Sequence, residues 1–225
     1  MISRSGFPRG QPFGTNAGTR THRTVLWILG AFLAALLTGA LTLTLFGTGI
    51  KGTTEALRVT GRLSFILFWP AYASSVLCRL NPSVLSALAR LRREFGLGFA
   101  AAHSVHAALI LWLIHIADHL PLPLSTIVLD GIGLAWVYAL SVLSAQYLRR
   151  ILKPQVWRLL FNVGLEWIAL VFLSDFLILP LQQGHELSLS YLPFTILLLL
   201  AAVPRWVHTL SGLGHRFVYE SSRSA

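Results

Sequence analysis

Six apolar runs, each of about 20 residues or more, follow one another along this chain and are separated by short polar segments. A helix of about 20 residues crosses the roughly 30 Å hydrocarbon layer of a bilayer. Backbone groups in lipid must form hydrogen bonds within their own segment, so each run is predicted to be a helix. We therefore predict an all-α polytopic membrane protein, a bundle of six transmembrane helices. The predicted spans are Val25 to Ile50, Val59 to Leu80, Phe95 to Leu120, Leu124 to Leu148, Trp157 to Leu181 and Leu189 to Leu210.

The composition agrees with a chain that lies mostly in lipid. Hydrophobic residues make up 55% of the sequence and charged residues 12%, whereas soluble domains contain about 25% charged residues. The net charge of +10 comes from basic residues between the apolar runs, which is the pattern that sets membrane orientation. We therefore predict the lipid bilayer, and no nucleic acid, as a partner. The single cysteine, Cys78, excludes an internal disulfide framework and gives no zinc-site spacing.

The chain divides into three predicted parts. Residues 1–24 are rich in Gly, Ser, Pro, Thr and Arg and predict a disordered basic cytoplasmic tail. Residues 25–210 form the predicted membrane domain, and residues 211–225 form a short cytoplasmic tail. By the positive-inside rule, both termini of this multi-pass protein are expected in the cytoplasm, with the domain in a bacterial inner membrane.

One segment departs from the positive-inside rule. The loops after the third and fifth runs contain no Lys or Arg, as expected for outer loops. The predicted first outer loop contains Lys51, Arg58 and Arg62, which Glu55 offsets only in part. Six spans still fit the remaining basic residues best.

The third run contains four histidines, His103, His106, His115 and His119. Ionisable side chains are rare in spans, and imidazole is the least costly because it stays neutral while it binds a metal or relays a proton. At about 100° per residue, the first two lie about 60° apart on one helix face, and the last two lie about 40° apart on a nearly opposite face. The outer pair, beside Asp118, is expected at the membrane interface. For the deeper pair, a cofactor ligand and a hydrogen bond to a neighbouring helix both stay open.

Three carboxylates lie within predicted spans: Asp130 in the fourth, and Glu166 and Asp175 in the fifth. A carboxylate in a span costs several kcal/mol unless it is protonated or partnered. Glu166 and Asp175 would pair with the histidines of the third span if the two helices face each other. The structural alternative is a hydrogen bond that holds two helices together. We expect that structural role for Asp130, and Glu166 is the better functional candidate because it lies deeper.

The third run also carries a family resemblance. Its basic pair, followed by Gly-Leu and then a histidine, resembles the ferric reductase-like transmembrane domain superfamily, through Arg92, Arg93, Gly96, Leu97 and His106. This superfamily contains ferric reductases, NADPH oxidases and the haem-binding membrane subunit of a bacterial methionine sulfoxide reductase system. The resemblance covers about residues 25–210. It extends to Thr60 to Arg62, to Trp157 to Leu160, and to Gly164, Trp167 and Phe172.

The resemblance implies a haem b held between helices by histidines on both sides, since bis-imidazole ligation gives a six-coordinate iron suited to electron transfer. His106 matches the iron ligand on the third span, and His119 approximates the second position on that helix. On the facing helix, Phe161 and Ser174 stand where the family pattern has histidines. A haem at His106 would therefore take another partner, such as His103 or His208, or would be five-coordinate.

Three functions follow as hypotheses, and no catalytic residue is predicted. The first is an oxidoreductase component that transfers electrons across the membrane by haem b, with a separate flavoprotein or quinol as donor, because the sequence contains no nucleotide-binding motif. The second is a degenerate non-haem member that acts as a membrane accessory or binding subunit, which Phe161 and Ser174 favour. The third is a proton or solute pathway built from Glu166, Asp175 and the histidines.

Overall fold

The computed structural model describes residues 16–80, 86, 88–119, 123–144, 151–183 and 185–221. Within these ranges the chain is helical and contains no β-strand. The elements are α1 (Asn16–Phe46), α2 (Ile50–Leu80), α4 (Arg92–Ile116), α5 (Leu124–Leu143), α7 (Pro154–Leu173), the π-helical turn η1 (Ser174–Ile178), α8 (Leu179–Gln183) and α9 (His185–Ser221).

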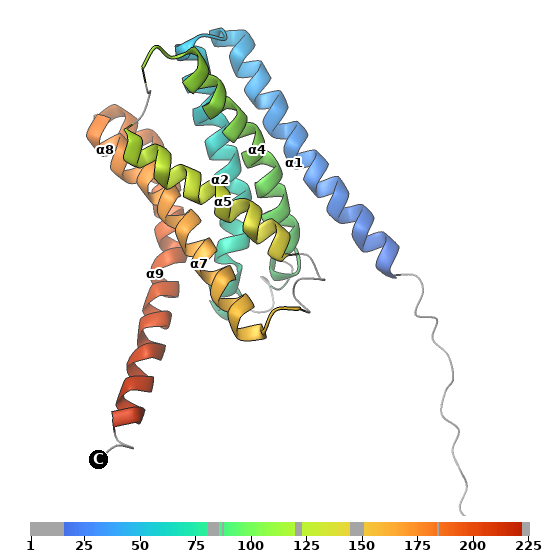
Figure 1. Cartoon of the computed structure of the whole chain (residues 1–225), viewed down its shortest axis with the longest axis vertical. Helices are drawn as coiled ribbons and strands as arrows, with labels where there is room; N and C mark the ends of the chain where they lie inside the picture. The colour runs from blue at the N-terminus through green and yellow to red at the C-terminus, as the bar shows by residue number, and fades with distance from the viewer. Residues whose placement is uncertain are drawn as a thin grey trace, which may run out of the picture.

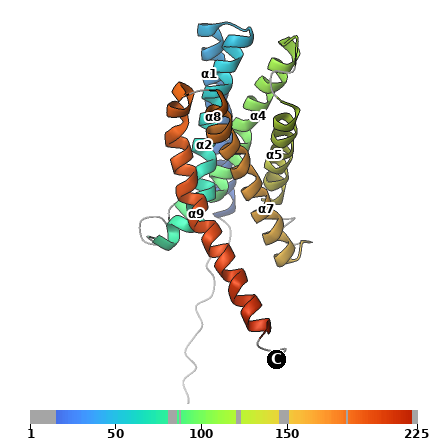
Figure 2. The same ribbon diagram turned by 90° about the vertical axis from the view of Figure 1, so that its left-hand side faces the viewer.

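Successive long helices run in opposite directions and form one bundle (Figures 1 and 2). The start of α1 and the end of α9 lie at the same end of this bundle (Figure 1). We name it the terminal end, and α4 and α7 also begin there. Residues 16–24 and 211–221 are helical, so α1 and α9 include parts of the chain that we had predicted as tails. Residues 1–15 of the predicted basic tail lie outside the described ranges.

Among the described residues, length and composition mark five helices as able to cross a membrane, so the predicted count of six is not confirmed. These helices are Thr21–Phe46, Arg92–Ile116, Leu124–Leu143, Pro154–Gln182 and Leu189–Val207. The difference is α2, which contains the predicted span Val59 to Leu80. This helix already begins at Ile50, so it includes the charged residues that we had assigned to an outer loop.

Packing explains why α2 is more polar than its neighbours. It contacts α1, α4 and α9, and several of its hydroxyl side chains are buried, among them Thr53, Thr60 and Ser74. Thr60 and Ser74 donate hydrogen bonds to carbonyls one turn earlier in the same helix, which lets small hydroxyls lie between packed helices. A helix that faces other helices does not need the hydropathy of one that faces lipid.

The turn between α1 and α2 depends on glycine. The helix α1 ends at Phe46 because Gly47 adopts φ +87°, a left-handed conformation that side chains with a Cβ rarely take. A Cβ added to Gly52 would lie 1.8 Å from the carbonyl oxygen of Gly47. These two glycines therefore let α2 start directly beside the end of α1.

Aromatic side chains fill the centre of the bundle. The ring centroid of Phe65 on α2 lies 5.3 Å from that of Phe172 on α7 and 5.1 Å from that of Phe176 on η1, and both pairs are edge-to-face. The ring centroids of Phe68 on α2 and Phe99 on α4 are 5.3 Å apart. Such ring pairs add stabilisation beyond the burial of their area. These aromatic contacts join α2, α4 and α7 across the centre.

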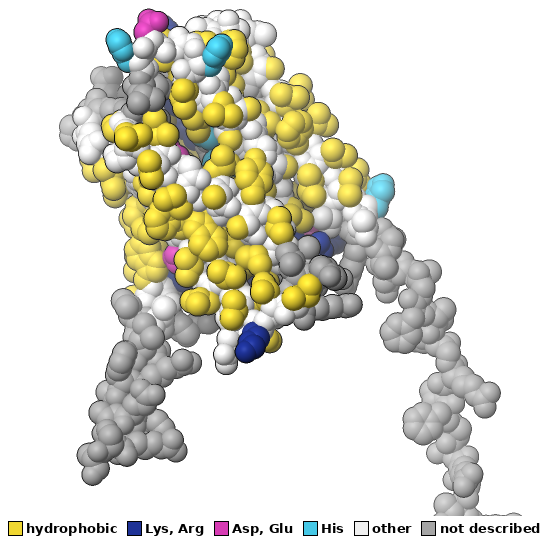
Figure 3. Space-filling view, in the orientation of Figure 1, with side chains coloured by type: hydrophobic (Ala, Val, Ile, Leu, Met, Phe, Trp, Pro, Cys, Tyr) yellow, Lys and Arg dark blue, Asp and Glu magenta, His cyan; other side chains and the backbone are white. Residues whose placement is uncertain are grey.

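The face of the bundle seen in the space-filling view is largely apolar (Figure 3). Along α1, Leu37 is 67% exposed and Leu45 is 70% exposed. Soluble monomers rarely expose continuous apolar patches of more than a few hundred Å². The five apolar helices and this surface indicate a protein embedded in a lipid bilayer.

The helix that follows α7 contains a π-turn with an identifiable cause. Pro180 has no N–H group to donate to the carbonyl of Phe176, one turn earlier. The backbone N–H of Leu179 donates instead to the carbonyl of Ser174. Thr195 of α9 donates its hydroxyl to the carbonyl of Phe176 at 3.0 Å. This hydrogen bond joins α9 to η1.

Candidate functional site

The two deeper histidines of α4 lie side by side. The ring centroids of His103 and His106 are 5.3 Å apart, and the ring planes differ by 26°. The Nδ1 atom of His106 is 3.0 Å from the hydroxyl oxygen of Thr60 on α2. His103 packs on Phe99, and its buried Nδ1 atom has no hydrogen-bond partner among the described residues. We name Thr60, His103 and His106 the histidine site.

The contacts of Thr60 indicate the tautomer of His106. A threonine hydroxyl has one proton, and Thr60 is 2.8 Å from the carbonyl of Ala56, which can only accept. We infer that Thr60 donates to Ala56 and that His106 donates its Nδ1 proton to Thr60. The lone pair of the His106 ring then lies on Nε2.

A glycine of α2 makes room for the His106 ring. A Cβ added to Gly61 would lie 3.2 Å from Cε1 of His106, which is closer than nearly all real Cβ contacts. The absence of a side chain at Gly61 therefore allows α2 and the imidazole to approach closely. The segment Thr60 to Arg62, which carries part of the family resemblance, thus touches the histidine that the resemblance identifies.

The described residues do not fit a haem with two histidine ligands. Axial ligands reach the iron from opposite faces of the porphyrin, whereas His103 and His106 leave the same face of one helix with nearly parallel rings. On α7, Phe161 stacks on Trp157 at 5.0 Å between ring centroids, and neither side chain is an imidazole. The side chain of His208, the other partner that we considered, lies outside the part that the structure describes.

The outer histidines lie at the far end of α4. This helix ends at Ile116, so His119 lies in the bend that follows and not on the helix where a second haem ligand was expected. His115 and His119 are both exposed. Among the described residues, no group of three or more His, Cys, Asp or Glu side chains comes together as a metal site would require.

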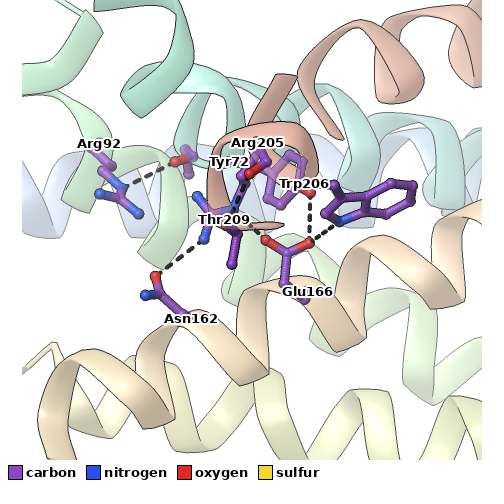
Figure 4. A network of polar contacts seen from close by, with 8 residues as sticks. Tyr72, Arg92, Asn162, Glu166, Arg205, Trp206 and Thr209 are labelled. Atoms are coloured by element: carbon purple, nitrogen blue, oxygen red, sulfur yellow. Dashed lines mark hydrogen bonds and ion pairs between the residues drawn. The ribbon is translucent and has the colours of Figure 1, made fainter. Parts of the chain in front are cut away.

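Glu166 forms a closed polar cluster (Figure 4). Its Oε2 atom accepts hydrogen bonds from the Tyr72 hydroxyl at 2.9 Å and from the Trp206 indole at 2.8 Å. Its Oε1 atom accepts a hydrogen bond from Nε of Arg205, and Nη2 of the same arginine donates to Oδ1 of Asn162 at 3.1 Å. These five residues are named the Glu166 cluster. The cluster joins α2, α7 and α9 near the terminal end of the bundle.

This cluster changes the role that we had expected for Glu166. The pairing of Glu166 with the histidines of α4, which required the two helices to face each other, is not found among the described residues, because Glu166 accepts hydrogen bonds from Tyr72, Arg205 and Trp206. The structural alternative, a polar contact between helices, describes this residue. Sequence reasoning missed Tyr72 and Arg205. Arg205 lies inside a predicted span, however, and an arginine at such a position indicates a carboxylate partner on a neighbouring helix.

The other two intramembrane carboxylates lie near each other. Asp175 of η1 interacts electrostatically with Asp130 of α5. One oxygen of Asp130 is buried without a hydrogen-bond partner among the described residues. The predicted pairing of Asp175 with the histidines is also not found in the described contacts, because its electrostatic neighbour is Asp130.

Comparisons with protein-family models, with curated proteins and with solved structures found no match to this chain. The family resemblance therefore rests on the sequence motifs around Thr60, Arg92 and Trp157 alone.

Proposed function

We propose that this chain is a membrane-embedded binding or accessory subunit, built on a ferric reductase-like helical bundle without a bis-histidine haem site. The histidine site carries this proposal, because its two rings leave one helix in the same direction. The aromatic centre supports it as well, since Phe99 packs between His103 and Phe172, at 5.2 Å and 6.0 Å between centroids. A planar cofactor would have to displace these rings.

Haem b electron transfer, with a flavoprotein or quinol as donor, is the second candidate. The unpaired Nδ1 atom of His103 and the inferred lone pair on His106 favour it, because a buried imidazole nitrogen without a partner is costly. This candidate requires a ligand that the described side chains do not supply.

An absorption spectrum separates the two candidates. The full chain is expressed with added haem precursor and purified in mild detergent beside a His106→Ala variant and a His115→Ala control. We expect no Soret band in any of the three proteins. A stoichiometric Soret band that His106→Ala removes and His115→Ala retains would overturn the proposal and establish the haem protein.

A further inference from the structure

A cavity opens between four helices near the terminal end of the bundle. Its volume is about 260 Å³, and residues of α2, α4, α5 and α7 line it. Its walls are mainly apolar and aromatic, with Phe99, Leu140, Phe161 and Leu165 among them. Pockets for whole small molecules usually hold roughly 300–1,000 Å³. This cavity therefore suits one apolar segment of a larger molecule.

Arginines line one part of the same cavity. Arg90, Arg92 and Arg93 contribute to it, and Arg90 and Arg93 are exposed. Arg92 is held in place, since its Nε donates a hydrogen bond to the carbonyl of Ala71 at 3.1 Å (Figure 4). Its guanidinium also lies 5.5 Å from the centre of the Phe161 ring. The cavity thus has an apolar body and a cationic end.

No carboxylate among the residues that line the cavity neutralises these arginines. The nearest acid in sequence, Glu94, is occupied by Arg23 of α1 at 2.6 Å. This end of the cavity is therefore complementary to an anion.

We propose that the cavity binds an anionic phospholipid, with its phosphate at Arg90 and Arg93 and the upper part of one acyl chain between α4, α5 and α7. Guanidinium groups match phosphate oxygens in charge and in geometry. Basic pockets between spanning helices recognise lipid head groups in this way. The inference deepens the proposed binding function and rests on it.

Native mass spectrometry of the full chain in detergent tests the site. Binding of phosphatidylglycerol is compared with that of phosphatidylcholine carrying the same acyl chains. We expect phosphatidylglycerol to bind more tightly, and the double variant Arg90→Gln/Arg93→Gln to weaken it about thirtyfold. The double variant Lys153→Gln/Arg158→Gln removes two charges from the start of α7 that do not line the cavity, and it should leave the affinity unchanged.

A second variant tests the apolar part. Ser141 lines the cavity, and Ser141→Phe should weaken phosphatidylglycerol binding while all arginines remain. Equal affinity for both lipids, or equal losses in the two charge variants, would overturn the proposal. If oleate bound as tightly as phosphatidylglycerol, with the same dependence on Arg90 and Arg93, the phospholipid proposal would be overturned and the ligand would be a fatty acid. Loss of lipid binding is read by mass spectrometry and haem binding by the Soret band, so a failure of the lipid proposal is distinguishable from a failure of the proposed function.

Discussion

The Glu166 cluster and the histidine site both contain polar groups inside the bundle, but the two regions differ in how completely these groups are hydrogen-bonded. In the Glu166 cluster, both carboxylate oxygens accept hydrogen bonds from other helices. In the histidine site, one ring nitrogen contacts Thr60 and another, on His103, is buried without a described partner. The carboxylate is the more costly group to bury, and it is the one that is satisfied.

This difference separates a structural role from a functional candidate. A network in which both carboxylate oxygens accept hydrogen bonds from other helices stabilises one arrangement of those helices. A buried nitrogen without a partner costs stability, so its presence points to a role other than packing. The number of satisfied donors and acceptors, rather than the presence of an ionisable group, distinguishes the two regions.

The largest effect is expected from removing the cation of the Glu166 cluster. Arg205→Met leaves the half-buried carboxylate of Glu166 without its ion pair, which should lower the free energy of unfolding by about 3 kcal/mol. Unfolding in mixed detergent micelles measures the loss. The double variant Glu166→Gln/Arg205→Met removes both charges and keeps an acceptor for Tyr72 and Trp206, so it should recover much of that loss. A double variant that is less stable than Arg205→Met would contradict the ion-pair account.

A smaller effect is expected at the hydrogen bond between Thr60 and His106. Thr60→Val removes the hydroxyl beside His106 and should cost about 1 kcal/mol in the same assay. Thr54→Val is the matched control, because the Thr54 hydroxyl bonds only to the Ile50 carbonyl of its own helix. Combining Thr60→Val with His106→Leu should cost less than the sum of the single changes. Strict additivity would mean that the two side chains do not interact.

The smallest effect is expected at Gly61. Alanine favours a helix by about 1 kcal/mol over glycine, but at Gly61 the new methyl group meets the His106 ring. Gly30→Ala on α1, where nothing lies within 4 Å, should stabilise the protein, whereas Gly61→Ala should give little or no gain. Equal stabilisation by the two changes would show that Gly61 does not limit the approach of α2 to His106.

The fold was predictable where helices face lipid and less so where they face each other. Exposed leucines such as Leu37 are required by the bilayer, so hydropathy finds α1 and the other apolar helices. The charged start of α2, residues 50–58, was predicted as a loop because hydropathy alone does not show that α2 packs against other helices. The π-turn was also missed, since it depends on a contact between Thr195 and Phe176 from different helices.

The candidate site was also predictable only in part. Helical periodicity placed His103 and His106 on one face, and their rings do stack. The partners of Glu166 could not be deduced, because Tyr72 and Arg205 lie far from it in sequence and meet it only through the packing of α2, α7 and α9. Spacing along one helix is local information, whereas pairing across helices is not.

One paired measurement tests the contrast between the two regions most directly. Glu166→Leu and His103→Leu replace two buried polar groups by the same apolar side chain, and their free energies of unfolding are measured in the same micelles. We predict that Glu166→Leu, which strands the donors of Tyr72, Arg205 and Trp206, costs about 3 kcal/mol or more. His103→Leu, which removes a nitrogen without a partner, should change stability by less than about 1 kcal/mol. A His103→Leu variant that loses as much stability as Glu166→Leu would contradict the account.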